Sequence, residues 1–384
     1  MKKPLQQLAE LGQSVWVDYL SRDLVQSGEL ERLMRDDAVV GVTSNPTIFQ
    51  DAMSGGNGYE EQLREEVGET DDPREIFLRL AARDVGDACG LLRSVFDRAA
   101  ITESAQTRTM HSQRDGFVSI EVDPTLAYDS AATTAAAVRL HALIDKPNLF
   151  VKIPATKEGL VAIEEMIANG KSINVTLIFS LQRYSQVAEA YVRGLERLIA
   201  AGGDPSQVFS VASFFVSRVD TEADRRLAQL GGHDDLKGTL AVANAKLAYQ
   251  LYRRIFSGER WALLEAKGAS TQRCLWASTS TKNSAYSDVK YVEELIGPET
   301  VNTMPEKTLR AFQQHGRVRT TLDEDVEEAQ RVLDRFARAG VDYVDVTDTL
   351  EREGVRAFEK SFAKLLDQIG GAAAEMRNKR QAAG

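Results

Sequence analysis

Short runs of apolar, often β-branched residues alternate along this chain with longer stretches that have the hydrophobic spacing of amphipathic helices. We expect strands at 15–20, 38–44, 116–122, 148–155, 172–179, 208–216, 271–279 and 301–304. Helical patterns between them include 24–34, 73–98, 131–144, 158–168, 181–200 and 239–257. Alternating strands and helices are typical of βα units on a parallel sheet. Eight such units in one chain predict an α/β fold, a closed (β/α)8 TIM barrel.

Additional helical patterns lie outside the eight units. One covers 4–11, before the first strand, and two follow the eighth strand at 323–338 and 351–369. No linker rich in Gly, Ser or Pro interrupts the series, so we expect residues 1–370 to form a single barrel domain with extra N- and C-terminal helices. The small and polar residues of 371–384 predict a flexible C-terminal tail.

Composition narrows the function classes. Of the 384 residues, 43% are hydrophobic and 27% charged, and the net charge of −10 argues against binding to nucleic acid or to anionic membranes. The cysteines, Cys89 and Cys274, are far apart in the sequence, and the histidines match no metal-ligand spacing, so we expect no disulfide framework and no metal. We also see no signal peptide and no membrane span, which predicts a cytoplasmic location. Composition leaves a monomer and a homodimer both open.

One lysine, Lys152, lies within the otherwise apolar segment 148–155. A charged amine in a buried strand must find a partner or lose its charge, and a neutral amine in a dry pocket can attack a carbonyl carbon to form a Schiff base. The alternative is a lysine at a strand end that reaches solvent.

Polar residues also follow the other predicted strands, where a barrel of this kind places its functional groups. They are Asp18, Thr43, Ser44, Asn45, Glu121, Asn174, Thr176, Ser213, Arg218, Ser278 and Lys282. Each alone has an ordinary explanation: Asp18 could cap a helix, and Asn45 before Pro46 could mark a turn. So many polar side chains on buried strands would be unfavourable unless they converged, so we predict that they share one pocket.

Several of these segments resemble the signatures of the transaldolase family, in the family's order. They are 43–46 (TSNP), 151–156 (VKIPAT), 174–180 (NVTLIFS) and 213–218 (SFFVSR), and the resemblance extends over about residues 10–370. The chain length is similar to that of the long bacterial subfamily. The resemblance implies transfer of a dihydroxyacetone unit from sedoheptulose 7-phosphate to glyceraldehyde 3-phosphate in the pentose phosphate pathway. It implies small-molecule sugar phosphates as partners, and no metal or organic cofactor.

The resemblance also implies roles for individual residues. Lys152 would form the imine with the donor ketose, and Asp18 would take the proton of the C4 hydroxyl as the C3–C4 bond breaks. Glu121, through a water held by Thr176, would move protons during imine formation. Among the substrate-binding residues, Asn45 and Asn174 would hold the hydroxyls of the dihydroxyacetone unit beside Thr43 and Ser44. The distal phosphate site would consist of Ser213, Arg218, Ser278 and Lys282.

The chain differs from some relatives at two positions. Shorter family members carry an arginine soon after the Ala-Ser of the seventh strand, whereas Lys282 is the basic residue here. The related fructose 6-phosphate aldolases, which release dihydroxyacetone instead of transferring it, carry a tyrosine where this chain has Phe215. An aldolase of that kind is the alternative function, and a barrel that only binds sugar phosphates is a second one, which predicts loss of the lysine or of the carboxylates.

Overall fold

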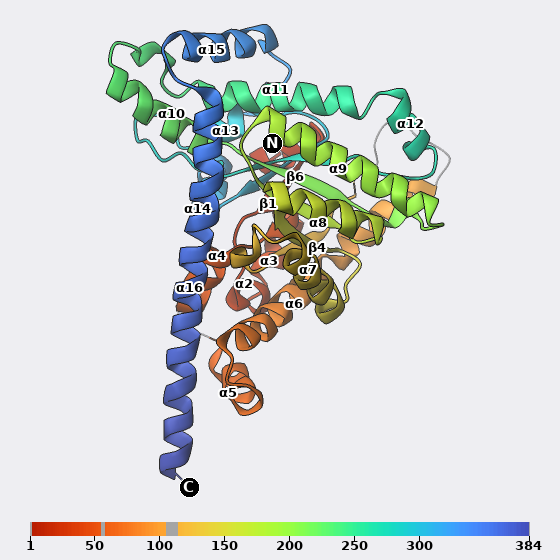
Figure 1. Ribbon diagram of the computed structural model, residues 1–384, viewed down its shortest axis with the longest axis vertical. Helices are drawn as coiled ribbons and strands as arrows, with labels where there is room; N and C mark the ends of the chain where they lie inside the picture. Colours follow the sequence, from red (N-terminus) through yellow and green to blue (C-terminus); the bar gives the residue numbers. More distant parts are fainter. Residues whose placement is uncertain (1, 55–57, 105–113, 384) are drawn as a thin grey trace.

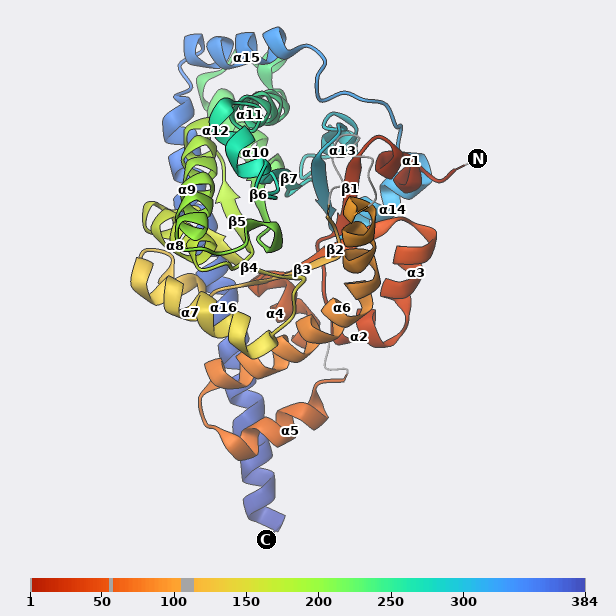
Figure 2. The same ribbon diagram turned by 90° about the vertical axis from the view of Figure 1, so that its right-hand side faces the viewer.

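The computed structural model describes residues 2–54, 58–104 and 114–383, and within them eight parallel strands form a closed barrel surrounded by helices (Figures 1 and 2). The strands pair in sequence order, and β8 pairs with β1 to close the barrel. They are β1 Gln13–Val17, β2 Val39–Thr43, β3 Phe117–Glu121, β4 Leu149–Pro154, β5 Ile173–Ile178, β6 Ser210–Phe215, β7 Arg273–Ala277 and β8 Thr300–Met304. The predicted (β/α)8 barrel is confirmed. Most predicted strands extend a residue or two beyond the observed ends, and the first was placed too late in the sequence.

Helices connect the strands and lie on the outside of the barrel (Figure 2). The α-helices are α1 Pro4–Glu10, α2 Arg22–Gln26, α3 Glu29–Asp36, α4 Pro46–Ser54, α5 Glu60–Glu69, α6 Pro73–Ser104, α7 Ser130–Ile144, α8 Lys157–Ala168, α9 Leu181–Ala200, α10 Ser217–Leu230, α11 Leu240–Ile255, α12 Glu259–Glu265, α13 Lys290–Glu293, α14 Glu306–His315, α15 Val326–Arg338 and α16 Tyr343–Ala383. Short 3-10 turns are η1 Pro124–Leu126, η2 Pro205–Gln207 and η3 Asp234–Leu236. The helix predicted at 24–34 is divided into α2 and α3, because Gly28 between them adopts a left-handed φ of 80°.

Aromatic rings fill the barrel interior below its carboxyl end. The rings of Trp16 on β1 and Phe150 on β4 lie 6.1 Å apart between centroids, although their strands are not neighbours, so the rings meet inside the barrel. The indole requires glycine on the next strand, since a Cβ at Gly41 would lie 2.5 Å from it. Side chains two residues apart on a strand share a face, so Lys152 lies directly above Phe150 and Asp18 follows Trp16. The aromatic layer therefore forms a floor beneath the polar carboxyl ends.

The C-terminal helix α16 runs along one side of the molecule, from the end near α15 to the C-terminus (Figure 1). It begins at Tyr343, earlier than the helix predicted at 351–369, and packs against α4, α6 and α10.

Residues 371–383, within the tail that the sequence predicts to be flexible, continue α16 as helix, and the flexibility itself stays a prediction; residue 384 lies outside the described residues. The run of alanines there favours helix. Ala373 is buried, and Arg377 forms an ion pair with Asp71 and donates to the carbonyl of Thr70, so tertiary contacts fix this part of the helix.

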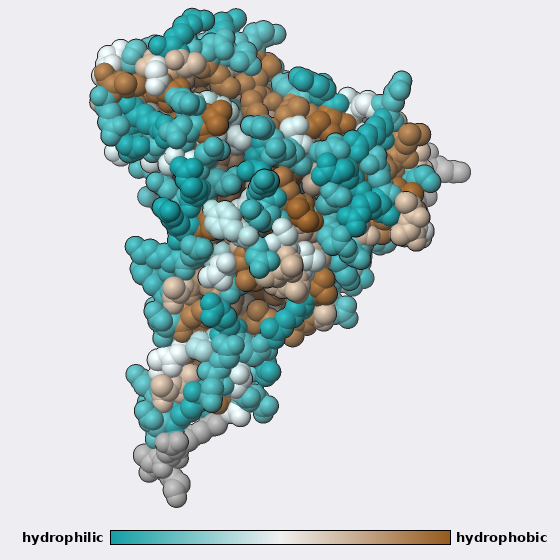
Figure 3. Space-filling model, in the orientation of Figure 1, coloured by the Kyte–Doolittle hydropathy of each residue, from teal (hydrophilic) through white to brown (hydrophobic). Residues whose placement is uncertain are grey.

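Among the described helices, none is long and apolar enough to cross a bilayer. The face of the molecule seen in Figure 3 is predominantly hydrophilic, with hydrophobic side chains in smaller patches between charged ones. Between β6 and β7 lie α10, α11 and α12, and α11 packs against α9 and α15.

Candidate active site

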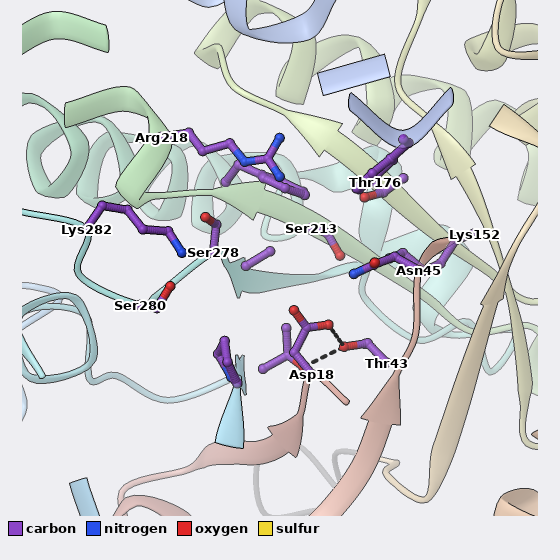
Figure 4. Close-up of a pocket in the computed structure, with 15 residues that line it drawn as sticks. Asp18, Thr43, Asn45, Lys152, Thr176, Ser213, Arg218, Ser278, Ser280 and Lys282 are labelled. Atoms are coloured by element: carbon purple, nitrogen blue, oxygen red, sulfur yellow. Dashed lines mark hydrogen bonds between the residues drawn. The ribbon is translucent and has the colours of Figure 1, made fainter. Parts of the chain in front are cut away.

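A cavity of about 140 Å³ opens at the carboxyl ends of the strands, above the aromatic floor (Figure 4). Most of the predicted site residues line it: Asp18, Thr43, Asn45, Lys152, Thr176, Ser213, Phe215, Arg218, Ser278 and Lys282. The other lining residues are Ala277, Ser280, Thr303, Pro305 and Phe358. Glu121, Ser44 and Asn174 lie directly behind this lining, where they contact Lys152 or Ser213. The structure thus brings the predicted residues together at one place.

Strand register explains the surroundings of Lys152. Glu121 on β3 and Asn174 on β5 are its register partners on the two neighbouring strands. Lys152 Nζ lies 3.3 Å from Glu121 Oε2 and donates a 3.0 Å hydrogen bond to the carbonyl of Ser44. The side chains of Lys152 and Glu121 are only 6% and 1% exposed. The buried lysine therefore has an acidic partner supplied by the adjacent strand, and does not reach solvent.

Asp18 lies across the cavity, immediately after β1. Its Oδ1 accepts a 2.6 Å hydrogen bond from Thr43 Oγ1, which also lies 2.7 Å from Thr303 Oγ1 at the end of β8. Burial raises the pKa of Asp18, and the charge of Lys152 and the bond from Thr43 oppose that rise. These contacts fix the orientation of a carboxyl group that holds a proton more readily than an exposed aspartate.

Glu121 is the second buried carboxyl group. Burial raises its pKa, Lys152 lowers it, and the negative charge of Asp18 raises it again. Two carboxyl groups with raised pKa values beside an amine can donate and accept protons in a reaction at that amine. Thr176 Oγ1 is buried next to them and has no hydrogen-bond partner among the described residues, so its hydroxyl can bind a group that enters the cavity.

The two predicted amide side chains, Asn45 and Asn174, have different hydrogen-bond partners. Asn45 Oδ1 accepts the backbone N–H of Ile48 at 3.0 Å, so it caps the start of α4, and its Nδ2 points into the cavity (Figure 4). The turn interpretation and the functional one are therefore compatible for Asn45. Asn174 bonds to Ser213 Oγ and Ser119 Oγ instead, which places it behind Ser213 as a support for that hydroxyl.

Basic residues gather at the end of the cavity opposite Lys152 and Asn45 (Figure 4). The guanidinium of Arg218 lies 5.3 Å from the ring centroid of Phe215 and 5.9 Å from that of Phe358 on α16. Burial lowers the pKa of Lys282, and the like charge of Arg218 lowers it further. Two cations and the hydroxyls of Ser278 and Ser280 at one end of a cavity suit a phosphate group.

Five lining residues were not predicted from the sequence: Ala277, Ser280, Thr303, Pro305 and Phe358. Thr303 and Pro305 lie at or just after the end of β8, and reading the end of that strand like the other seven would have found them. Ser280 lies two residues before Lys282, in the same loop. No sequence pattern pointed to Phe358 as a site residue, because it lies on a helix far along the chain, and only the folded structure shows where that helix packs on the barrel.

A closed (β/α)8 barrel with a lysine, two buried carboxyl groups and two cations around one cavity is the architecture of a barrel enzyme. The family model described as transaldolase/fructose-6-phosphate aldolase matches residues 15–369, and the chain belongs to this family.

Curated relatives agree with this assignment. A transaldolase of Acidothermus cellulolyticus is 52% identical over 95% of both chains. One of Parafrankia sp. is 50% identical over 96% of this chain and 98% of its own. Transaldolase 1 of Streptomyces coelicolor is 49% identical over 95% of this chain and 93% of its own.

Proposed function

We propose that this protein is a transaldolase of the pentose phosphate pathway. It would transfer a dihydroxyacetone unit from sedoheptulose 7-phosphate to glyceraldehyde 3-phosphate, giving erythrose 4-phosphate and fructose 6-phosphate. The observation that carries the proposal is the position of Lys152 Nζ, 3.3 Å from Glu121 and in one cavity with Asp18. The names of the relatives support the same reaction.

The reaction would begin with addition of Lys152 Nζ to the C2 carbonyl of the donor ketose. The resulting carbinolamine loses its hydroxyl as water when a proton is delivered to it, and an imine forms. Glu121 is next to the amine and holds a proton more readily than an exposed glutamate, so it can deliver this proton. The hydroxyl of Thr176 would hold the water through which the proton passes.

Carbon–carbon cleavage needs a base on the other side of the substrate. Asp18 would take the proton of the C4 hydroxyl while the electron pair of the C3–C4 bond moves onto the protonated imine, which becomes a neutral enamine. The aldehyde fragment leaves, and the acceptor aldehyde enters and adds by the reverse steps. The contact with Thr43 orients Asp18 for this transfer.

The distance between lysine and cations would set the substrate's orientation. With C2 at Lys152, the phosphate would lie at the opposite end of the cavity, where Arg218 and Lys282 are (Figure 4). Ser278 and Ser280 would donate further hydrogen bonds along the substrate, and Ser213, whose hydroxyl donates to Asn174, would accept one. Asn45 Nδ2 would bind a hydroxyl of the dihydroxyacetone unit. Positioning by several fixed groups lowers the entropic part of the barrier.

The alternative, a fructose 6-phosphate aldolase, is not favoured. Phe215 lines the cavity and brings no hydroxyl with which to hold or deprotonate a water near the imine. Without such a group the enamine should persist until an acceptor arrives, which is the behaviour of a transferase.

An acceptor-dependence assay tests the proposal. Purified protein with fructose 6-phosphate and erythrose 4-phosphate should form glyceraldehyde 3-phosphate and sedoheptulose 7-phosphate with no added metal or cofactor. Without an acceptor it should release little dihydroxyacetone, and rapid release would identify an aldolase instead.

Charged sugar phosphates do not cross membranes freely, so we propose a cytoplasmic location. We expect the protein to be a monomer or a homodimer.

A further inference from the structure

The loop that carries Ser280 and Lys282 is fastened to the helix that carries Arg218. This loop, residues 278–289, connects β7 to α13 and is named here the β7–α13 loop. At its start, the backbone N–H of Ser217 donates to the carbonyl of Ser278 at 3.0 Å, and the two hydroxyls also lie 3.0 Å apart. In its middle, the hydroxyl of Tyr286 donates to Asp224 Oδ2 at 2.6 Å.

Just beyond the loop, Tyr291 on α13 donates to Asp220 Oδ2 at 2.9 Å. The α10 residues in these contacts, 217, 220 and 224, are spaced by three and four and so lie on one face of the helix. Arg218 is on the same first turn and reaches the cavity. A single helix therefore presents one of the two cations and holds the loop that presents the other.

The side chain of Tyr286 packs tightly against its neighbours. Its ring lies against Gly238, where an added Cβ would come within 2.7 Å of the ring. The backbone N–H of Gly238 donates to Asp224 Oδ1 at 2.8 Å, so the carboxylate binds Gly238 with one oxygen and Tyr286 with the other. Residues 282–285 just before Tyr286 are exposed, whereas Tyr286 is half-buried. Tyr286 is thus the anchor for the exposed part of the loop.

An anchor is needed here because the charges repel one another. Arg218 and Lys307 act on Lys282 as like charges, and the attraction of Asp18 for Lys282 is weaker than the repulsion by Arg218. Without a bound phosphate, the remaining repulsion favours a loop position in which Lys282 has moved away from the cavity. The β7–α13 loop would then have to become ordered each time a phosphate binds, and the free energy spent on this ordering would lower the affinity.

We propose that Tyr286 is a positioning residue that, through its bond to Asp224, holds Lys282 near Arg218 and so sets the affinity for the phosphate end of the substrate. The inference rests on the proposed function. It concerns binding of the phosphate and leaves the chemistry at Lys152 unchanged.

The Tyr286→Phe variant tests this inference, since it removes one hydroxyl and keeps the ring on Gly238. Transfer from saturating sedoheptulose 7-phosphate, with release of erythrose 4-phosphate, would be measured with two acceptors, glyceraldehyde 3-phosphate and glyceraldehyde, which differ by the phosphate alone. We expect the KM for glyceraldehyde 3-phosphate to rise about tenfold, as for loss of one hydrogen bond to a charged group, with kcat within about twofold. The KM for glyceraldehyde should not change.

Control variants separate positioning from general damage. Tyr249→Phe removes a hydroxyl that donates to the carbonyl of Pro298 at 3.1 Å, away from the loop, and should match wild type with both acceptors. Asp224→Asn keeps polar atoms facing Tyr286 and Gly238 and should retain most of the affinity, whereas Asp224→Ala should behave like Tyr286→Phe. Calorimetric titration with inorganic phosphate should show the same loss of affinity in the absence of turnover.

The possible outcomes are distinct. Equal changes in KM for both acceptors, or a Tyr286→Phe variant that matches wild type in KM and phosphate affinity, would overturn the positioning role. A wild-type protein that transfers to neither acceptor would contradict the proposed function instead, and the phosphate titration would still report on the loop.

Discussion

Replacing Asp220 with asparagine should stabilise the protein above pH 6 and leave its stability unchanged near pH 3.5. Asp220 is 1% exposed, and burial raises its pKa from 3.8 to about 6, although Ala241 N–H and Tyr291 O–H donate to it. Between these values the unfolded chain loses the proton while the folded protein keeps it, so the stability that comes from the protonated form falls as pH rises. The difference amounts to about 3 kcal/mol at 1.36 kcal/mol per pKa unit.

Asparagine cannot ionise, and its amide can still accept from Ala241 and bond to Tyr291. Urea unfolding of Asp220→Asn and wild type from pH 3.5 to pH 8 should therefore give a difference in unfolding free energy that grows between about pH 4 and 6 and is constant above. Asp235→Asn, which removes the charge of an exposed carboxyl group nearby, controls for net charge. A variant that is less stable than wild type at pH 7.5, or a difference independent of pH, would show that Asp220 does not retain its proton in the folded protein.

Further predictions concern the reaction. Asp18→Ala should still form the imine with fructose 6-phosphate but lose carbon–carbon cleavage by at least about 100-fold, since the base for the C4 hydroxyl is gone; trapping yield and turnover measured together check this. Glu121→Ala should instead slow adduct formation, seen in rapid-quench trapping, and the opposite pattern would exchange the two roles. Phe215→Tyr should release free dihydroxyacetone from fructose 6-phosphate without an acceptor, measured enzymatically against wild type, while a variant without release would reduce Phe215 to a packing role.

The barrel could be predicted because each strand and each helix has its own hydrophobic period. The strand ends were less certain, as β1 shows: Gln13 and Ser14 belong to the strand although they are polar. Both side chains are buried and hydrogen-bonded, since Gln13 donates to the carbonyl of Leu295 and Ser14 Oγ accepts from Arg273. Tertiary hydrogen bonds of this kind compensate polar groups that hydropathy alone assigns to a loop. The same applies to the end of α16, where Ala373 becomes buried only against distant helices.

The grouping of the site residues was also predictable, since parallel strands in a barrel gather their carboxyl ends at one rim. The individual pairs were not. Glu121 faces Lys152 because of the register between β3 and β4, which the sequence does not display. The contacts of the Tyr286 side chain were even less predictable from the sequence, because they depend on Gly238 in a left-handed conformation and on a helix turn from another part of the chain. Such contacts arise from the packing of elements that are distant in sequence.

The central claim is that Lys152 forms a covalent imine with a ketose phosphate. Its most direct test is borohydride reduction of the protein with fructose 6-phosphate, followed by mass spectrometry of its peptides. We expect one reduced dihydroxyacetone adduct, on the peptide with Lys152, and none in a Lys152→Met variant. An adduct on Lys157, Lys171 or Lys282, or no adduct in an active wild-type protein, would contradict it.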